Sequence, residues 1–200
     1  MIEKAWRRRG RVARGRRFVR VALIAIVLGA SATPLLLGQP AEGPPSEFEV
    51  KAAYLYNFGR FVRWPATPEQ DTFAICVLGR DPFGPILDSI LEGERLDGKP
   101  ALPRRIRNVT DVENCRIVFI SPSEASRLSW IIARLEGKSV LTVSDLKDFA
   151  LSGGMIELVL EDGRVRFDVD LNATRAAGLN LSSELLRVAR RVRGAEGGAS

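Results

Sequence analysis

The sequence contains no histidine and only two cysteines, Cys76 and Cys115. Histidine is the commonest general base and the commonest zinc ligand in proteins, so both roles lack their usual residue here. Two thiols alone do not complete a four-ligand structural zinc site. The sequence also has no G-x-S-x-G and no G-x-G-x-x-G motif. We therefore expect a protein without catalytic residues, metal or cofactor, which acts by binding.

The basic residues are concentrated at one end of the chain, although the formal net charge is +6. Residues 1–45 hold nine of the 30 Lys and Arg residues but only two of the 24 Asp and Glu residues. The rest of the chain therefore has 21 basic and 22 acidic residues and is close to neutral. A nucleic-acid-binding domain needs a basic face of its own, so we expect no nucleic-acid partner.

The N-terminus has the pattern of a targeting segment. A basic stretch is followed by the uncharged run Val21–Ala30 and then by the small residues Ala30-Ser31-Ala32. This order is typical of a secretory signal peptide. The alternative is an uncleaved anchor, because the apolar stretch from Val21 to Leu37 approaches the length that spans a membrane. We expect a signal peptide over residues 1–32, a Pro/Gly-rich linker over residues 33–46, and a periplasmic location.

One α/β domain is predicted over residues 47–193, followed by a flexible tail, residues 194–200. Helical spacing of apolar residues, capping residues and short apolar runs predict the following order: helix 47–63, strand 73–79, helix 81–92, strand 102–109, helical turn 110–113, strand 116–120, helix 121–136, strand 139–143 and helix 144–149. Buried apolar strands that alternate with helices are typical of a parallel sheet.

The pattern changes near the C-terminus. Strands 155–160 and 164–171 flank Asp162-Gly163, which predicts an antiparallel hairpin. A last helix is expected over residues 182–193. In the second strand the odd-numbered residues are expected to face the core, and the others to form a solvated face: Arg164, Arg166, Asp168 and Asp170. We predict a mixed, mostly parallel, doubly wound sheet like flavodoxin or half of a solute-binding protein, with a C-terminal hairpin and helices on both faces.

The two cysteines lie in or beside predicted strands that are neighbours in a doubly wound sheet of order 2-1-3. Neighbouring strands are separated by about the Cα distance that a disulfide accepts. An exported protein also meets an oxidising compartment. We therefore expect a Cys76–Cys115 disulfide, and the alternative is two buried free thiols that pack as small apolar groups.

Ligands of open α/β sheets bind beyond the carboxyl ends of parallel strands. Side chains and helix N-termini at these ends form the candidate site for a ligand or a partner: Arg80, Asp81, Phe83, Ser121, Ser144 and Asp145. The alternative is that Asp81, Ser121 and Ser144 simply cap the helices that follow.

Several runs in this order and spacing resemble the YfiR family: Val50–Phe58 with Trp64-Pro65, Ile75–Gly79 with Asp81–Gly84, Leu141–Asp145, Gly153–Ile156 and Ala177–Leu186. The resemblance implies a periplasmic α/β protein of a kind that often forms homodimers. The best-known members of the family repress a membrane-bound diguanylate cyclase, and so lower cyclic di-GMP and biofilm formation. Cys76 and Cys115 match a cysteine pair of that family. A second family pair, near residues 140–154, is missing from this sequence.

Two functions follow from this pattern. In the first, the protein represses a membrane signalling enzyme by contact with its periplasmic domain, and the partner is an inner-membrane diguanylate cyclase or a sensor kinase. In the second, the protein is a small-molecule-binding module that uses the crevice at the strand ends.

Overall fold

The structure is a computed structural model that describes residues 44–65 and 70–194. The expected signal peptide, most of the linker and residues 195–200 of the expected tail lie outside the described residues. The boundaries of these segments therefore stay predictions.

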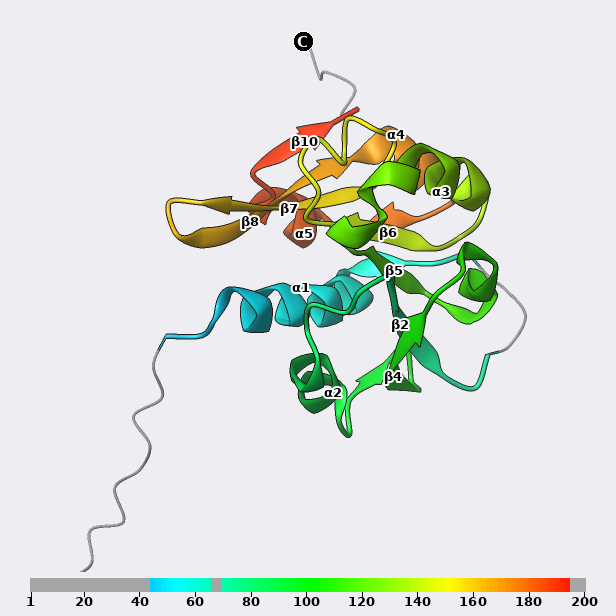
Figure 1. The fold of residues 1–200 in the computed structure, drawn as a ribbon, viewed down its shortest axis with the longest axis vertical. Helices are drawn as coiled ribbons and strands as arrows, with labels where there is room; N and C mark the ends of the chain where they lie inside the picture. Colours follow the sequence, from blue (N-terminus) through cyan, green and yellow to red (C-terminus); the bar gives the residue numbers. More distant parts are fainter. Residues whose placement is uncertain (1–43, 66–69, 195–200) are drawn as a thin grey trace, which may run out of the picture. The chain divides into compact units, whose positions relative to one another are not determined.

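An eight-stranded sheet of order β10-β8-β7-β6-β5-β2-β4-β3 forms the framework of the domain (Figure 1). Its strands are β2 (Phe73–Leu78), β3 (Arg95–Leu96), β4 (Lys99–Ile106), β5 (Ile117–Ile120), β6 (Leu141–Ser144), β7 (Ile156–Glu161), β8 (Arg164–Asp170) and β10 (Arg191–Arg193). Strands β4, β2, β5, β6 and β7 run parallel, whereas β7 and β8 form an antiparallel hairpin. This mixed, mostly parallel sheet confirms the predicted fold class.

Helices cover both faces of the sheet, and each face has its own apolar core. In β2, Phe73, Ile75 and Val77 point to the core under α1 (Glu47–Phe61), α2 (Pro85–Leu91) and α5 (Ser183–Val188). The alternate residues, Ala74, Cys76 and Leu78, point to the core under α3 (Leu128–Leu135) and the 3₁₀ helix η1 (Val109–Asn114). A strand that is covered on both sides has no solvated face, which explains its continuous apolar sequence.

Helix α1 begins at a capping box. The Ser46 hydroxyl accepts a hydrogen bond from the Glu49 N–H, and the Glu49 carboxylate accepts one from the Ser46 N–H. The chain leaves the helix at Val62 and forms β1 (Val62–Arg63), which pairs with β9 (Asn180–Leu181). Pro65 follows, and a proline disfavours helical geometry at the residue that precedes it.

The hairpin has the predicted turn. Asp162 and Gly163 both have positive φ, 49° and 70°, as a type I′ turn requires. Phe167 is buried, as expected. Asp168 was expected on a solvated face, and this was wrong, because it is buried and its carboxylate binds Arg190.

Several helix boundaries in the first half differ from the prediction. Helix α2 begins at Pro85 rather than at Asp81. The residues predicted as a capped turn at 110–113 belong to η1, which has no side-chain cap. The predicted strand 102–109 begins and ends three residues earlier, as β4. No helix forms over residues 144–149, because Ser144 ends β6 and the residues after it enter turns in which the N–H groups of Ser152 and Gly154 donate to the carbonyls of Asp148 and Phe149.

The helix predicted over residues 121–136 begins with a separate 3₁₀ helix, η2 (Pro122–Arg127), before α3. Ser121 caps η2, which agrees with the capping alternative, and the Glu124 carboxylate binds Arg127. At the C-terminus, the predicted helix 182–193 divides into α5 and β10. Helix α4 (Leu171–Ala176), which follows β8, was not predicted.

Candidate functional site

The two serines at the carboxyl ends of β5 and β6 are buried and serve the backbone. The Ser144 hydroxyl donates to the Ile120 carbonyl at 2.7 Å and accepts from the Leu146 N–H at 3.1 Å. The Ser121 hydroxyl accepts from the Ser123 N–H at 3.3 Å. These contacts hold the turns that follow the two strands, so neither serine is free to act as a nucleophile.

Arg80 and Asp81 lie in the loop that follows β2. The Arg80 N–H donates to the Ser123 hydroxyl at 2.9 Å, which ties this loop to the one after β5. The Asp81 carboxylate accepts from the Phe83 N–H at 2.8 Å and from Arg105 Nε at 2.8 Å. Asp81 therefore shapes the loop before α2. The sequence-based alternative that Asp81 caps the helix was wrong, because Gly84 holds the N-cap position.

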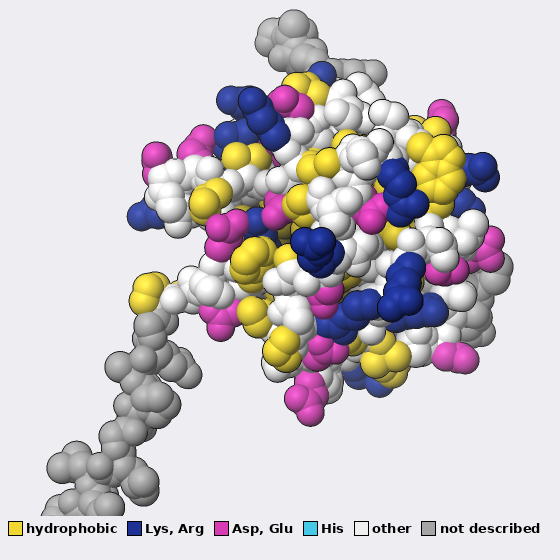
Figure 2. All heavy atoms as spheres, viewed as in Figure 1, with side chains coloured by type: hydrophobic (Ala, Val, Ile, Leu, Met, Phe, Trp, Pro, Cys, Tyr) yellow, Lys and Arg dark blue, Asp and Glu magenta, His cyan; other side chains and the backbone are white. Residues whose placement is uncertain are grey.

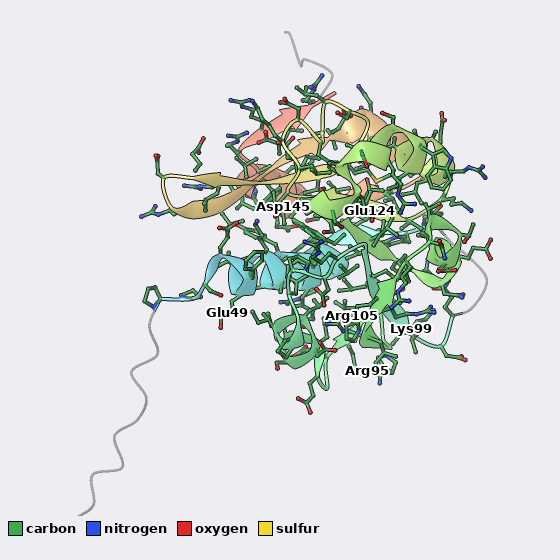
Figure 3. All side chains as sticks on the ribbon, in the orientation of Figure 1. Glu49, Arg95, Lys99, Arg105, Glu124 and Asp145 are labelled. Atoms are coloured by element: carbon green, nitrogen blue, oxygen red, sulfur yellow. A yellow bond between two sulfur atoms is a disulfide. The ribbon has the colours of Figure 1, made fainter. Side chains whose placement is uncertain are left out.

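Arg105, at the end of β4, clamps this loop from the neighbouring strand. Its guanidinium donates to both carboxylate oxygens of Asp88 and to the Gly84 carbonyl, in addition to Asp81. The hydrogen bonds from Arg105 hold the pKa of Asp88 below its ordinary value. Figure 3 labels Arg105, Glu124 and Asp145, which come from the segments at the carboxyl ends of β4, β5 and β6.

Phe83 is a core residue at this position. It is 1% exposed, and its ring lies edge-to-face against Phe119 of β5, with 4.8 Å between the centroids. Phe48 of α1 packs on Phe83 at 6.3 Å. The first turns of α1 therefore lie over the end of the sheet where the crevice was expected.

Lys51 of α1 is the residue at this site that sequence reasoning missed. It is 4% exposed, and its ammonium donates to Asp145 Oδ2 at 2.5 Å and contacts Glu47 Oε1 at 2.5 Å. The same nitrogen lies 5.3 Å from the centroid of the Phe48 ring. A lysine in the middle of a wide apolar helical stripe, four residues after Glu47, is the sequence feature that points to it.

Burial of the Lys51 ammonium works to lower its pKa, but the hydrogen bonds to Asp145 and Glu47 outweigh that effect and raise the pKa above its ordinary value of 10.5. The lysine therefore stays charged at every physiological pH. The second carboxylate oxygen of Asp145, Oδ1, is buried and has no hydrogen-bond partner among the described residues. Asp145 thus depends on Lys51 for compensation of its charge.

The candidate residues at the strand ends are therefore largely joined to one another and to α1. The structure brings Asp145 close to Lys51, and Arg80 close to Ser121 through Ser123. It does not leave Phe83 or Ser144 accessible. Binding of a ligand or a partner by these six residues stays a prediction.

Cys76 and Cys115 form a disulfide with a Cα–Cα distance of 5.9 Å. Cys76 lies in the middle of β2, and Cys115 comes just before β5, which pairs with β2 in parallel. The 2-1-3 strand order that suggested the bond is therefore present. Both residues are buried, so the disulfide joins the two central strands inside the core on the α3 side.

Two further properties concern only the part of the chain that the structure describes. No three His, Cys, Asp or Glu side chains in it come together in a way that could hold a metal ion. None of the helices within residues 44–65 and 70–194 has both the length and the apolar character that are needed to cross a membrane.

Comparison with known proteins gives one family. The family model described as YfiR/HmsC-like matches residues 48–190. Among solved structures, the chain is similar to a conserved domain protein of Vibrio cholerae O1 biovar El Tor (12% identity, TM-score 0.45), with 74% of this chain and 60% of that chain covered. It is also similar to an ABC domain from Streptococcus pneumoniae in complex with L-Trp (8% identity, TM-score 0.44, 60% and 55% covered). The match thus spans less than two thirds of either solved chain.

Proposed function

This chain belongs to the YfiR/HmsC-like family, and on that premise we propose that it represses a membrane-bound diguanylate cyclase by contact with the cyclase's periplasmic domain. The family implies a periplasmic regulatory role in cyclic di-GMP signalling. The observation that carries the proposal is the extent of the family match, which includes elements from α1 to α5.

The chemistry of the chain supports binding rather than turnover. The sequence has no histidine, and both cysteines are consumed in the disulfide. The serines and carboxylates at the strand ends are engaged in hydrogen bonds and ion pairs with their neighbours. A protein of this kind changes the activity of an enzyme by preferring one of its conformations.

A contact surface is available at the β7–β8 hairpin, which projects from the sheet beside α5 (Figure 1). Leu160 near the tip of β7 is 53% exposed, and Val188 at the end of α5 is 63% exposed. Arg190, just after α5, joins the two elements through Glu161 at 3.1 Å. Figure 2 shows apolar side chains among interspersed charges of both signs on this face. We name Leu160 and Val188 the hairpin surface, and we propose that it contacts the cyclase.

The required energy is modest. A tenfold shift between an active and an inactive cyclase needs about 1.4 kcal/mol of differential affinity. Burial of one exposed leucine or valine side chain contributes about 1.5–3 kcal/mol. A small apolar contact that forms with only one state of the partner is therefore sufficient.

The test is complementation of a deletion strain. We expect deletion to raise cyclic di-GMP, and the wild-type gene to restore the lower level. The double variant Leu160→Glu/Val188→Glu should fail to restore it, although its thermal melt is unchanged. Leu102→Glu is the matched control, because Leu102 is 44% exposed on β4, at the other edge of the sheet.

Two outcomes contradict the proposal at different levels. An unchanged cyclic di-GMP level in the deletion strain contradicts the function itself. Full restoration by the double variant contradicts only the hairpin surface as the contact. Capture of the periplasmic protein with membrane proteins then separates a cyclase from a sensor kinase, and sedimentation of the purified protein tests the expected homodimer.

A further inference from the structure

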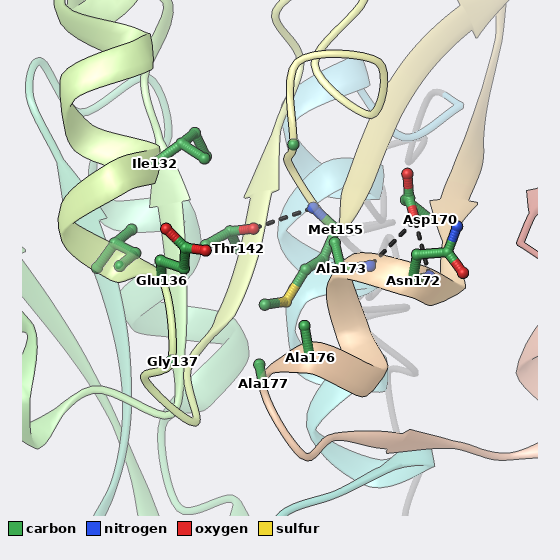
Figure 4. Close-up of a pocket in the computed structure, with 12 residues that line it drawn as sticks. Ile132, Glu136, Gly137, Thr142, Met155, Asp170, Asn172, Ala173, Ala176 and Ala177 are labelled. Atoms are coloured by element: carbon green, nitrogen blue, oxygen red, sulfur yellow. Dashed lines mark hydrogen bonds between the residues drawn. The ribbon is translucent and has the colours of Figure 1, made fainter.

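A cavity of about 420 Å³ lies on the α3 side of the sheet, away from the strand ends and from the hairpin surface. Helix α3 and the turn after it form one wall, α4 forms the opposite wall, and β6 with the start of β7 lies between them (Figure 4). Pockets that hold small ligands have volumes of roughly 300–1,000 Å³, so this cavity is large enough for one.

The inner part of the cavity is apolar. Ile132 and Leu135 line it from α3, Met155 from just before β7, Ala173 from α4, and Ala177 from the C-cap of α4. Figure 4 shows Ile132 and the two labelled alanines at the C-terminal end of α4 on opposite sides of the space, with the Met155 side chain between them. The small alanines leave room for the apolar body of a ligand, which larger residues at these positions would fill.

The charged groups of the lining are both acidic. Glu136 follows α3 on one side, and Asp170 ends β8 on the other side. Asp170 uses Oδ1 to accept hydrogen bonds from the N–H groups of Asn172 and Ala173, which caps α4, and its Oδ2 has no partner among the described residues. No lysine or arginine is part of the lining.

A buried hydroxyl adds a polar contact inside the cavity. Thr142 of β6 is 2% exposed, and its Oγ1 accepts a hydrogen bond from the Met155 N–H at 3.0 Å. A hydroxyl also has a second lone pair and its own proton. Neither has a partner among the described residues, so the threonine can accept one further hydrogen bond and donate one inside the cavity.

No ion pair joins a basic side chain to Glu136 or Asp170 among the described residues, although Arg193 of β10 is the register partner of Asp170. Arg175 of α4 donates to the Gly194 carbonyl, and the Arg134 guanidinium lies over the Trp130 ring at 5.3 Å. Lys138 lies one residue beyond Gly137, outside the lining. A concave site with charge of one sign concentrates ligands of the opposite sign.

We propose that this cavity binds a small organic cation, with an ammonium group between Glu136 and Asp170 and an apolar body against Met155 and α4. An anionic ligand would place its charge beside two carboxylates and is therefore disfavoured. The inference does not depend on the regulation of a cyclase, because the cavity and the hairpin surface share no residue.

The probe set is hexylamine, hexanol and hexanoate, which share one apolar chain and differ in charge. We expect isothermal titration of the purified exported protein to show binding of hexylamine, at least tenfold weaker binding of hexanol, and no binding of hexanoate. Tighter binding in low salt is also expected, because the attraction is electrostatic.

Variants locate the binding. Ala176→Phe should weaken hexylamine binding at least tenfold, because Ala176 is an exposed residue of the lining and a phenyl ring there fills the mouth of the cavity. Glu136→Gln and Asp170→Asn should each weaken it about threefold to tenfold. Asparagine also caps helices well, so the second variant keeps α4. Ala133→Phe is the control, since Ala133 is exposed on α3 but not in the lining.

Each opposite result overturns the proposal. Absence of hexylamine binding at millimolar concentration excludes an organic cation of this type. Equal affinity for hexylamine and hexanoate excludes selection by charge. Unchanged affinity in a normally melting Ala176→Phe variant, or equal losses in Ala176→Phe and Ala133→Phe, places the binding elsewhere. A failure of the cyclase test leaves all of these results interpretable.

Discussion

Reduction of the Cys76–Cys115 disulfide is the perturbation whose magnitude follows most directly from the structure. The bond joins residues with a sequence separation of 39, and the enclosed loop contains α2, β3, β4 and η1. In the chain-entropy model, closure of a loop of this length stabilises the folded state by about 4 kcal/mol. That is a large share of the roughly 5–15 kcal/mol by which domains are usually stable.

Reduction should weaken the domain without unfolding it. The backbone around the bond remains paired, because the Arg116 N–H donates to the Ala74 carbonyl at 2.9 Å and the Ser121 N–H donates to the Leu78 carbonyl at 3.0 Å. The two thiols then pack as small apolar groups in the same core. For a domain of this size, we expect the melting temperature to fall by about 8–16 °C.

The assay is thermal and urea unfolding of the purified protein with and without dithiothreitol, with free thiols counted in both samples. The double variant Cys76→Ala/Cys115→Ala is the control, and reductant should leave its unfolding midpoint unchanged. If the wild-type midpoint stays constant while two free thiols per chain appear, the loop-entropy argument is refuted.

Two further predictions use the same unfolding assay. Lys51→Met should lower the free energy of unfolding by about 3–5 kcal/mol, because it leaves the largely buried Asp145 carboxylate, whose side chain is 13% exposed, without a counter-charge. Lys51→Met/Asp145→Leu should recover most of that loss. A single variant as stable as wild type would contradict this account. Gly79→Ala should cost at least about 1 kcal/mol more than Gly163→Ala. Both glycines have positive φ, but a Cβ at Gly79 would lie 2.5 Å from Ser123 Oγ, whereas one at Gly163 has nothing within 4 Å. Equal losses of unfolding free energy in the two variants would show that the Ser123 side chain moves away from the new Cβ without strain.

The central part of the fold was predictable because its local pattern and its burial agree. Strands β2 and β5 are apolar at every position and are covered on both faces. Once they are adjacent in the sheet, the Cα separation of the cysteines follows from strand spacing. The hairpin turn was equally predictable, since Asp162-Gly163 lies between two strands of clear alternation.

A second turn of the same type was missed. Asp97 and Gly98 have positive φ of 51° and 73° and connect β3 to β4. The flanking residues, Arg95-Leu96 and Lys99-Pro100, are too few and too polar to show alternation. A turn dipeptide predicts a hairpin only when the strands on both sides are recognisable.

The C-terminal error has a non-local cause. Residues 182–193 have the spacing of a helix, but only Ser183–Val188 are helical. Residues Arg191–Arg193 pair in parallel with β8, and the Arg190 guanidinium binds the buried Asp168 carboxylate. A strand that exists because of a partner some twenty residues earlier in the chain leaves no trace in its own sequence pattern.

The candidate site was the least predictable part, for the same reason. Lys51 lies on a helix, where a lysine normally faces solvent, and its burial depends on a carboxylate 94 residues away. Sequence reasoning found Asp145 but not the cation that neutralises it.

The ion pair between Lys51 and Asp145 also disfavours binding of a small molecule at the strand ends. A ligand at the strand ends has to displace the first turns of α1 and replace both ion pairs of Lys51. A cation in the cavity between α3 and α4 displaces no ion pair of the described residues, so that cavity is the more accessible place for a small molecule on this domain.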